Sequence, residues 1–252
     1  MKDFHNTAII VPARLASLRF PEKLLAETMG KPLILHTALR LKEQIPEFDL
    51  FFAVDGDRLS DILTDAGFNA IKTDPSLPSG TDRIAQANDK LGFQKVINIQ
   101  ADEPMVLREH VLALAEALNV PENAMSTLAI PFGPGEDPKD PNHVKVVVDE
   151  NGSALYFSRS PIPFSRDVIK KQSPSKYLKH LGMYAYQASF LSIFSEKQPT
   201  PLEKIEKLEQ LRALEMGMRI AVCQTQYPTL GVDHPDDLDR FTKLDTVIGV
   251  LS

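Results

Sequence analysis

Short apolar runs alternate with amphipathic stretches through the first half of the chain. The runs TAIIVP, DLFFAVD and KVINIQ have the length of strands, whereas PLILHTALRLKEQ, DRLSDILTDAGF and REHVLALAEALN repeat their apolar residues at helical spacing. Strand, helix, strand in this order is typical of βαβ units with right-handed crossovers. We therefore expect strands at residues 7–12, 50–54 and 95–99 in an α/β fold, with a mostly parallel central sheet flanked by helices.

The pattern changes after residue 130, where PFGPGEDPKDPN is rich in loop-forming residues. The next stretch, VKVVVDENGSALYFS, alternates apolar and polar positions around Asn151-Gly152, a pair that predicts a hairpin. Thr200-Pro201 is a start signal for a helix that we expect to run from about residue 201 to 216. Its apolar side would consist of Leu202, Ile205, Leu208, Leu211 and Leu214. A strand at RIAVC and a last helix from about Pro235 follow.

Length and composition narrow the class of protein. The 252 residues suffice for a single α/β domain with a modest insertion. The net charge of -6 argues against a general nucleic-acid-binding protein, so an anionic ligand would need a local cluster of cations. The lone cysteine, Cys223, cannot form an internal disulfide, which favours a cytoplasmic location, and we expect its thiol to be buried. No run approaches the roughly 18 apolar residues of a membrane span, so we expect no membrane partner.

Charged side chains follow the predicted strands at their carboxyl ends, where open parallel sheets bind ligands. The loop VPARLASLRFPEK after the first strand carries Arg14, Ser17, Arg19 and Lys23. Acidic residues follow the other strands or precede the last helix, and these are Asp55, Asp102, Glu103 and Asp233. A polyphosphate with Mg²⁺ needs both fixed cations and carboxylates. The residues alone therefore predict a phosphate and metal site, with helix capping as the alternative for Asp102 and Asp233.

Several short motifs occur in a fixed order over most of the chain. They are PAR-x-x-S-x-R-x-P-x-K at 12–23, SGTDR at 79–83, QADEP at 100–104, NHVKVV at 142–147, ALYFSRSPIP at 154–163, KHLGMYAY at 179–186, LEKIEKLEQLRALE at 202–215 and GVDHPDDL at 231–238. In this order they resemble the cytidylyltransferases of 3-deoxy-manno-octulosonate (Kdo), the CMP-Kdo synthetases of lipopolysaccharide synthesis. The opening motif is shared with cytidylyltransferases for other sugar acids, whereas KHLGMYAY and LEQLR are more specific to the Kdo enzymes. The resemblance implies a Rossmann-like nucleotidyltransferase fold.

The resemblance also implies the reaction and the residues that carry it. A Mg²⁺-dependent enzyme of this family transfers CMP from CTP to the anomeric hydroxyl of Kdo. The implied catalytic residues are Arg19, Lys23, Asp102 and Asp233, with Mg²⁺ held by Asp102 and Asp233. The implied nucleotide-binding residues are Arg14, Ser17, Arg19, Lys23, Asp55, Ser79, Gly80 and Arg83. The implied sugar-binding residues are Gln100, Arg159, His180, Tyr184, Glu209 and Gln210. An inserted hairpin and helix region at about 135–215 would form a lid and the interface of a homodimer.

The chain departs from the usual family motifs at Glu22, Ala101 and Leu230. Glu22 replaces a glycine in the triphosphate loop, and Ala101 replaces a glycine in Q-G-D-E-P. An altered sugar acid, such as 8-amino-3,8-dideoxy-manno-octulosonate, is the alternative substrate within the class. Asp55-Gly56-Asp57 also matches the D-x-D metal pattern of nucleotide-sugar glycosyltransferases. A nucleotide-binding module without activity is the remaining alternative.

Overall fold

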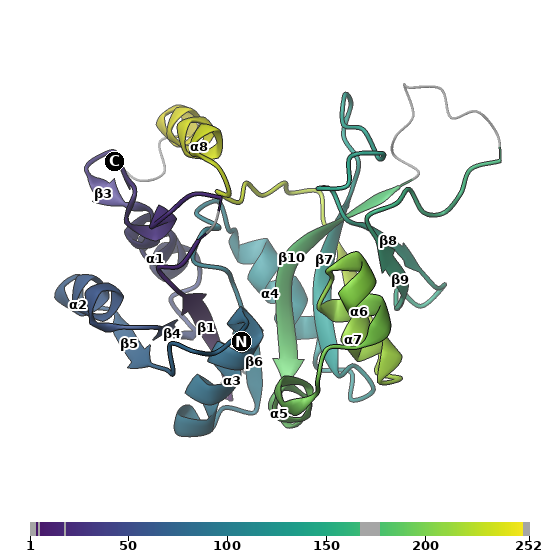
Figure 1. Ribbon diagram of the computed structural model, residues 1–252, viewed down its shortest axis with the longest axis horizontal. Coiled ribbons are helices and arrows are strands. Elements are labelled where there is room, and N and C mark those ends of the chain that lie inside the picture. The colour runs from purple at the N-terminus through teal and green to yellow at the C-terminus, as the bar shows by residue number, and fades with distance from the viewer. Residues whose placement is uncertain (1–3, 5, 18, 167–176, 249–252) are drawn as a thin grey trace. The chain divides into compact units, whose positions relative to one another are not determined.

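The computed structural model describes residues 4, 6–17, 19–166 and 177–248, and these fall into two compact units (Figure 1). The first unit consists of Met1–Val111 with Thr229–Ser252, and the second consists of Leu112–Pro228. The region expected to form a lid, at about 135–215, lies in the second unit, and its residues 167–176 are outside the described part. No helix in the described part of the chain has the length and apolarity that a membrane span requires.

The first unit contains a parallel sheet of the strands β1 (Thr7–Ala13), β4 (Asp49–Val54), β5 (Asn69–Lys72) and β6 (Lys95–Asn98). Within this unit the strand order is β6-β1-β4-β5, so β1 has a strand on each side. Every residue of β1 is buried, which explains why its sequence is a continuous apolar run. The strands at the three positions predicted from the sequence are confirmed, and so is their parallel arrangement.

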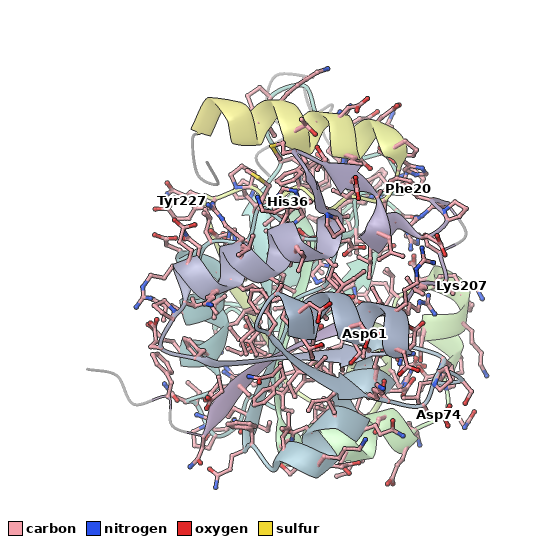
Figure 2. The ribbon with its side chains drawn as sticks, turned by 90° about the vertical axis from the view of Figure 1, so that its left-hand side faces the viewer. Phe20, His36, Asp61, Asp74, Lys207 and Tyr227 are labelled. Atoms are coloured by element: carbon pink, nitrogen blue, oxygen red, sulfur yellow. The ribbon has the colours of Figure 1, made fainter. Side chains whose placement is uncertain are left out.

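Helices and short elements flank this sheet (Figure 1). They are η1 (Lys23–Leu25), β2 (Glu27–Thr28), β3 (Lys31–Pro32), α1 (Leu33–Gln44), α2 (Asp57–Asp65), α3 (Gly80–Leu91) and α8 (Pro235–Ile248). The chain leaves the first unit within α4 (Arg108–Ala117). Near the chain's end α8 packs on α1, where the ring of His36 lies 5.3 Å from that of Phe241 (Figure 2). The last helix therefore belongs to the same unit as the first strand.

The second unit contains β7 (Met125–Pro131), β8 (Lys145–Val148), β9 (Ala154–Ser158), β10 (Leu178–Gln187) and β11 (Ile220–Gln224). Strand β11 runs parallel to β7, whereas β10 is antiparallel to both β7 and β8. The hairpin predicted at Asn151-Gly152 is confirmed by the antiparallel pair β8 and β9, and Gly152 has a φ of 76°. The pairing of β10 with β7 shifts register between Leu181 and Tyr184, which is a bulge. Cys223 on β11 is only partly buried, so the prediction of a buried thiol is not met in full.

The long helix expected at residues 201–216 is wrong, because the chain forms two short helices there. After α5 (Ala188–Glu196), α6 (Pro201–Glu206) ends at Lys207 and α7 (Gln210–Glu215) follows. Lys207 adopts a φ of 54°, a left-handed conformation that terminates a helix. As a result Ile205 is 78% exposed, whereas Leu208 and Leu211 are buried. The predicted start at Thr200-Pro201 is confirmed by a capping box between Thr200 and Glu203.

A buried ion pair joins the two short helices. Arg212 donates from Nε to Glu203 Oε2 at 2.8 Å and from Nη2 to Glu203 Oε1 at 2.6 Å. Its Nη1 donates to the carbonyl oxygens of Phe194 and Lys197, both at 3.1 Å. The guanidinium also lies 4.6 Å from the centre of the Phe194 ring. Arg212 thus ties the end of α5 to the capping box of α6, although the backbone between α6 and α7 is kinked.

We predict that Glu203→Gln destabilises the protein by about 3 kcal/mol, because it leaves the Arg212 guanidinium buried without its counter-charge. For a chain of this size that corresponds to a loss of about 6–12 °C in melting temperature, which differential scanning calorimetry measures. Lys204→Gln on the same helix is the control, because Lys204 is exposed and its loss has little effect. A loss of less than about 2 °C in the Glu203 variant would contradict the ion pair's structural role.

Candidate active site

A cavity of about 490 Å³ in the first unit gathers residues from the ends of separate strands. Its polar lining consists of Arg14, Ser17, Arg19, Lys23, Gln100, Asp102 and Asp233. The cations belong to the loop and η1 after β1, Gln100 and Asp102 follow β6, and Asp233 precedes α8. The residues that the sequence analysis singled out from three distant segments thus line one cavity. Gln100, for which the resemblance implied sugar binding, lies among the residues implied for the triphosphate and the metal.

The ammonium group of Lys23 is at the centre of the charges in this cavity. It donates to Asp102 Oδ2, to Asp233 Oδ1 at 3.1 Å and to the carbonyl oxygen of Val232 at 3.1 Å. Arg19 Nη2 lies 2.7 Å from the same oxygen of Asp233. Both carboxylates therefore bind cations from the loop after β1. This arrangement differs from the helix-capping alternative, in which the carboxylates would accept from backbone N–H groups.

The opposite charges hold one another in their ionised forms. Burial alone would raise the pKa of Asp233, but Lys23 and Arg19 outweigh burial and lower that pKa below its usual value. Burial alone would also lower the pKa of Lys23, but Asp102 and Asp233 outweigh it and raise the pKa. At neutral pH Lys23 is thus charged and Asp233 is ionised.

Glu103, next to Asp102 in the chain, has a raised pKa, whereas that of Asp233 is lowered. Burial raises the pKa of Glu103 to about 8, and the negative charge of Asp102 adds to this rise. Its Oε2 is buried and has no hydrogen-bond partner among the described residues. A Cβ at Gly231 would lie 2.9 Å from Glu103 Oε1, so a larger residue there would displace this side chain. From the sequence, Glu103 was one of the acidic residues that follow the predicted strands and a member of the QADEP motif, but no separate role was predicted for it.

The start of α3 brings the SGTDR motif close to the cavity. Ser79 caps the helix by accepting from the backbone N–H of Asp82 at 3.1 Å, and the Asp82 side chain accepts from Ser79 in return. A Cβ at Gly80 would lie 3.2 Å from Pro12 Cγ and 3.6 Å from Gln100 Oε1. Glycine at this position therefore allows the helix to approach the end of β1. The hydroxyl of Ser79, predicted to contact the nucleotide, is already engaged in capping.

Arg83 is buried close to Asp55, which is only partly buried. Asp55 Oδ2 accepts from the backbone N–H of Leu15 at 3.0 Å, and its Oδ1 is buried without a partner among the described residues. Arg83 is 1% exposed and donates to Thr73 Oγ1 at 2.5 Å. Burial lowers the pKa of Arg83, and the charge of Asp55 partly offsets this effect. Asp55 thus fixes the loop that carries the cations while keeping one free acceptor oxygen.

The D-x-D pattern at Asp55-Gly56-Asp57 does not form a pair of converging carboxylates. Asp55 accepts from the backbone of Leu15, whereas Asp57 is exposed at the start of α2 and forms an ion pair with Lys72. A D-x-D metal site requires both carboxylates to point toward the same ion. The geometry therefore gives no support to the glycosyltransferase alternative.

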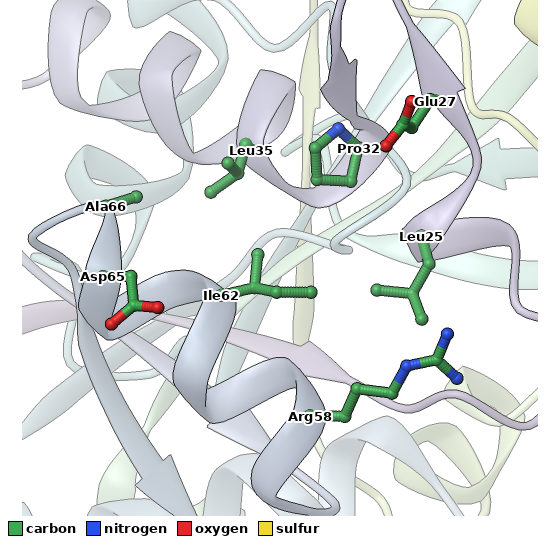
Figure 3. A pocket seen from close by; sticks show the side chains of 8 residues that line it. All are labelled: Leu25, Glu27, Pro32, Leu35, Arg58, Ile62, Asp65 and Ala66. Atoms are coloured by element: carbon green, nitrogen blue, oxygen red, sulfur yellow. The ribbon is translucent and has the colours of Figure 1, made fainter.

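Glu22, one of the departures from the family motifs, adopts a conformation that glycine favours. Its φ of 51° and ψ of 30° are left-handed, a conformation suited to the glycine that the family motif implies at this position. Its carboxylate accepts a hydrogen bond from Arg58 on α2. Arg58 also lines a larger cavity of about 550 Å³ together with apolar side chains such as Leu25 and Ile62 (Figure 3). That cavity contains none of the residues predicted from the sequence.

The other residues implied for sugar binding belong to the second unit. His180 and Tyr184 are on β10, and Glu209 and Gln210 are at the start of α7. Tyr184 donates from its hydroxyl to Gln210 Oε1 at 3.3 Å, and the rings of His180 and Tyr184 are 5.5 Å apart. Gln210 is 4% exposed, and its Nε2 has no hydrogen-bond partner among the described residues. A buried donor without a partner is a place where a polar ligand can bind.

Arg159 makes contacts of another kind. Its guanidinium donates to the carbonyl oxygens of Glu206 at 2.8 Å, Pro141 at 2.9 Å and Lys207 at 3.3 Å. The carboxylate of Glu206 accepts from the backbone N–H of Arg159 at 2.9 Å. Lys145, which is fully buried, donates to the carbonyl oxygen of Arg159. In this structure Arg159 therefore links three loop segments, and its implied contact with the sugar stays a prediction.

The acidic residues of the first cavity match the way proteins bind Mg²⁺ with nucleotides. No group of three or more His, Cys, Asp or Glu side chains in the described residues could hold a metal by itself. Mg²⁺ is commonly held by one or two carboxylates together with substrate phosphates and waters. Asp102 and Asp233, which share Lys23 as a partner, supply that number of carboxylates. The donor set thus fits a metal that arrives with a polyphosphate.

Comparison with known proteins identifies the family. The family model described as "Cytidylyltransferase" matches residues 8–220. The 3-deoxy-manno-octulosonate cytidylyltransferase of Thermodesulfovibrio yellowstonii is 43% identical over 92% of this chain and 95% of its own length. The enzyme of the same name from Francisella tularensis subsp. holarctica is 42% identical over 96% of this chain and 99% of its own.

Solved structures lead to the same family. A CMP:2-keto-3-deoxy-manno-octonic acid synthetase complexed with CTP has a TM-score of 0.88 and 35% identity, and the match covers 96% of this chain and 99% of that one. A cytidylyltransferase from Leptospira borgpetersenii, with 11% identity and a TM-score of 0.64, shares the fold. On the evidence of the full-length relatives, this chain belongs to the 3-deoxy-manno-octulosonate cytidylyltransferase family.

Proposed function

We propose that this protein transfers CMP from CTP to the anomeric C2 hydroxyl of Kdo, giving CMP-Kdo and pyrophosphate. The observation that carries the proposal is the convergence of Arg19, Lys23, Asp102 and Asp233 on one cavity in a chain whose relatives are named for Kdo cytidylyltransfer. The C2 oxygen attacks the α-phosphorus in line, the bond from that phosphorus to pyrophosphate breaks, and the hydroxyl proton passes to solvent. CMP-Kdo would then serve lipopolysaccharide synthesis.

The cations of the loop after β1 would bind the triphosphate. Little covalent chemistry falls to the protein in phosphoryl transfer, so its contribution is positioning and the neutralisation of charge on the leaving pyrophosphate. Arg19 suits two phosphate oxygens at once, whereas Lys23 acts as a point charge. Arg14 and Ser17 line the same cavity and would complete this phosphate site. Lys23 would exchange its contacts with Asp102 and Asp233 for contacts with phosphate.

The base and ribose would lie near the start of α3 and Asp55. Cytosine carries an amino group that donates hydrogen bonds, and Asp55 Oδ1 is a buried acceptor with no partner among the described residues. Gly80 gives the ligand close access to the backbone, and Arg83 adds a fixed positive charge. The resemblance implied the same four residues for nucleotide binding, namely Asp55, Ser79, Gly80 and Arg83.

Asp102 and Asp233 are the residues that would hold Mg²⁺. Held there, the ion would neutralise phosphate charge and would lower the pKa of the attacking hydroxyl. The protein's own part is to keep Asp233 ionised, which Lys23 and Arg19 do by lowering its pKa. A separate general base is then unnecessary.

The polar side chains of the second unit would bind the sugar acid. Kdo presents a carboxylate and several hydroxyl groups, which need both donors and acceptors. The unpartnered Nε2 of Gln210 supports a role for Gln210, and Tyr184 holds the Gln210 side chain in place. His180 and Glu209 supply acceptors.

We also propose that the enzyme acts as a homodimer in the cytoplasm, which light scattering of the purified protein and fractionation of cells would test.

Our first functional prediction concerns the carboxylates. CTP, Kdo and Mg²⁺ will release pyrophosphate, and excess chelator will stop the reaction. Asp102→Asn and Asp233→Asn will each lower kcat by on the order of 10²-fold or more, because each removes a preorganised charge. Asp57→Asn is the matched control, since Asp57 is exposed and forms a surface ion pair with Lys72, and the kcat of this variant should stay within about twofold. A coupled pyrophosphate assay measures all of these rates.

Two results would refute these assignments. Full activity in excess chelator would contradict the assignment of a metal ion to this site. Variants of Asp102 and Asp233 that both stay within about threefold of the wild type would make these residues structural, since this loss is less than about 0.7 kcal/mol. A large loss in Asp57→Asn alone would revive the D-x-D alternative.

A second prediction concerns Gln210. Gln210→Leu keeps a side chain of similar size but removes the buried Nε2 donor, so the KM for Kdo should rise about tenfold, as expected for one lost hydrogen bond. The KM for CTP should change less than twofold. Steady-state kinetics with each substrate varied in turn separate the two effects, and an equal rise in both values would contradict a sugar-specific role.

The choice between Kdo and its 8-amino analogue needs a competition experiment. With both sugars at equal concentration, the ratio of products gives the ratio of kcat/KM values, which defines specificity. We predict a preference for Kdo, because the departures at Glu22, Ala101 and Leu230 fall outside the KHLG and LEQLR motifs. A preference above about tenfold for the amino sugar would overturn this, and Glu209→Gln should then reduce the preference, since a carboxylate gains more from a protonated amine.

A further inference from the structure

The bulge in β10 brings an unusual set of hydrogen-bonding groups to one buried hydroxyl. Register between β10 and β7 is regular from Leu178 to Leu181 and resumes at Tyr184, which lies opposite Thr127. The Thr127 side chain is fully buried. Its Oγ1 lies 2.8 Å from the carbonyl oxygen of Met183 and 3.3 Å from that of Leu181, and these residues flank the bulge. Bulges often serve to aim side chains near functional sites.

The same hydroxyl also contacts His180. Thr127 Oγ1 lies 2.9 Å from Nε2 of the His180 ring. A carbonyl oxygen cannot donate, so the short contact between Thr127 and Met183 requires the hydroxyl proton to point toward Met183. Because a threonine hydroxyl has only one proton, it must act as the acceptor toward His180. The proton of the His180–Thr127 hydrogen bond therefore belongs to Nε2.

The His180 ring is neutral, which fixes the state of its other nitrogen. The rings of Phe157 and Tyr184 lie 5.0 Å and 5.5 Å from that of His180. Burial lowers the pKa of His180 to about 3, so the ring carries a single N–H proton at neutral pH. With that proton on Nε2, the Nδ1 atom has a lone pair and can only accept a hydrogen bond.

We propose that Thr127 is a positioning residue that holds His180 in the Nε2–H tautomer, so that Nδ1 accepts a hydrogen bond from a hydroxyl group of the sugar acid. This inference rests on the proposed function insofar as His180 faces the sugar. It also orients the substrate, because a carboxylate is an acceptor and cannot pair with an acceptor nitrogen. His180 therefore binds a hydroxyl of the sugar, and the sugar carboxylate must be met by other residues.

The bulge explains why the buried Thr127 can hold His180 in one tautomer. In the structure it places the carbonyl oxygens of both Leu181 and Met183 within reach of one hydroxyl, which gives the Thr127 proton two acceptors other than His180. A hydroxyl without such acceptors could rotate and donate to His180 instead, which would place the ring proton on Nδ1. The KHLGMYAY segment thus contains both the histidine and the backbone that determines its tautomer.

Nitrogen NMR of the wild-type protein, labelled with ¹⁵N in histidine, tests the tautomer without any assay of activity. The His180 signals are assigned by their loss in His180→Gln. We expect a protonated Nε2 and an unprotonated Nδ1, and we expect Kdo alone to shift the Nδ1 signal. A protonated Nδ1 in the wild type would overturn the proposal. A correct tautomer whose Nδ1 signal does not respond to saturating Kdo would overturn the assignment to the sugar.

Two variants of Thr127 test its part in binding. Thr127→Ser keeps the hydroxyl, so the tautomer should persist and the KM for Kdo should stay within about twofold. Thr127→Val removes the hydroxyl, so both tautomers should appear and the KM for Kdo should rise about tenfold, with the KM for CTP within about twofold. A valine variant with the wild-type tautomer and KM for Kdo would overturn the proposal, as would a serine variant with the valine phenotype. If the valine variant does not fold, the nitrogen NMR spectra of the wild type and of the serine variant decide whether the proposal holds. If the protein releases no pyrophosphate from CTP and Kdo, the spectra still decide the tautomer.

Discussion

The ammonium group of Lys23 holds the polar cavity of the first unit together. It binds Asp102, which is 79 positions away in sequence, and Asp233, which is 210 positions away. Partly buried carboxylates are costly unless they are paired, and neighbouring carboxylates repel one another. By pairing with both carboxylates, Lys23 offsets the cost of their burial and their mutual repulsion. The loop after β1, the turn after β6 and the segment before α8 can therefore meet. The same charges that stabilise the cavity are those that a metal and a polyphosphate require.

Much of this arrangement could be predicted from the sequence, because parallel strands impose it. The runs that became β1, β4 and β6 are apolar since they are buried, and the carboxyl ends of adjacent parallel strands meet at one edge. Charged residues directly after such runs must therefore lie close together. The roles of Arg19, Asp102 and Asp233 came from the family resemblance, but the proximity of Asp102 to the loop that carries Arg19 follows from strand order.

Other features could not be predicted, because they depend on contacts between distant residues. The break at Lys207 has no glycine or proline to announce it, and apolar spacing continues across it. Glu103 lies between Asp102 and Pro104 in the sequence, which gives no sign that burial raises its pKa. The sequence also identifies His180 as a candidate for sugar binding, but it does not indicate which ring nitrogen carries the proton. That property arises from Thr127 and from a bulge that becomes visible only when β10 pairs with β7.

The division of the first unit between the two ends of the chain affects how the protein can be made. Asp233 lies in the segment Thr229–Ser252, which is synthesised after the whole of the second unit. During translation, domains fold as their residues emerge, beginning from the N-terminus. Lys23 and Asp102 are thus available long before Asp233, and α8 can pack on α1 only after the second unit has been synthesised. A ribosome-bound chain therefore lacks one of the two carboxylates that pair with Lys23 until the segment before α8 has left the ribosome.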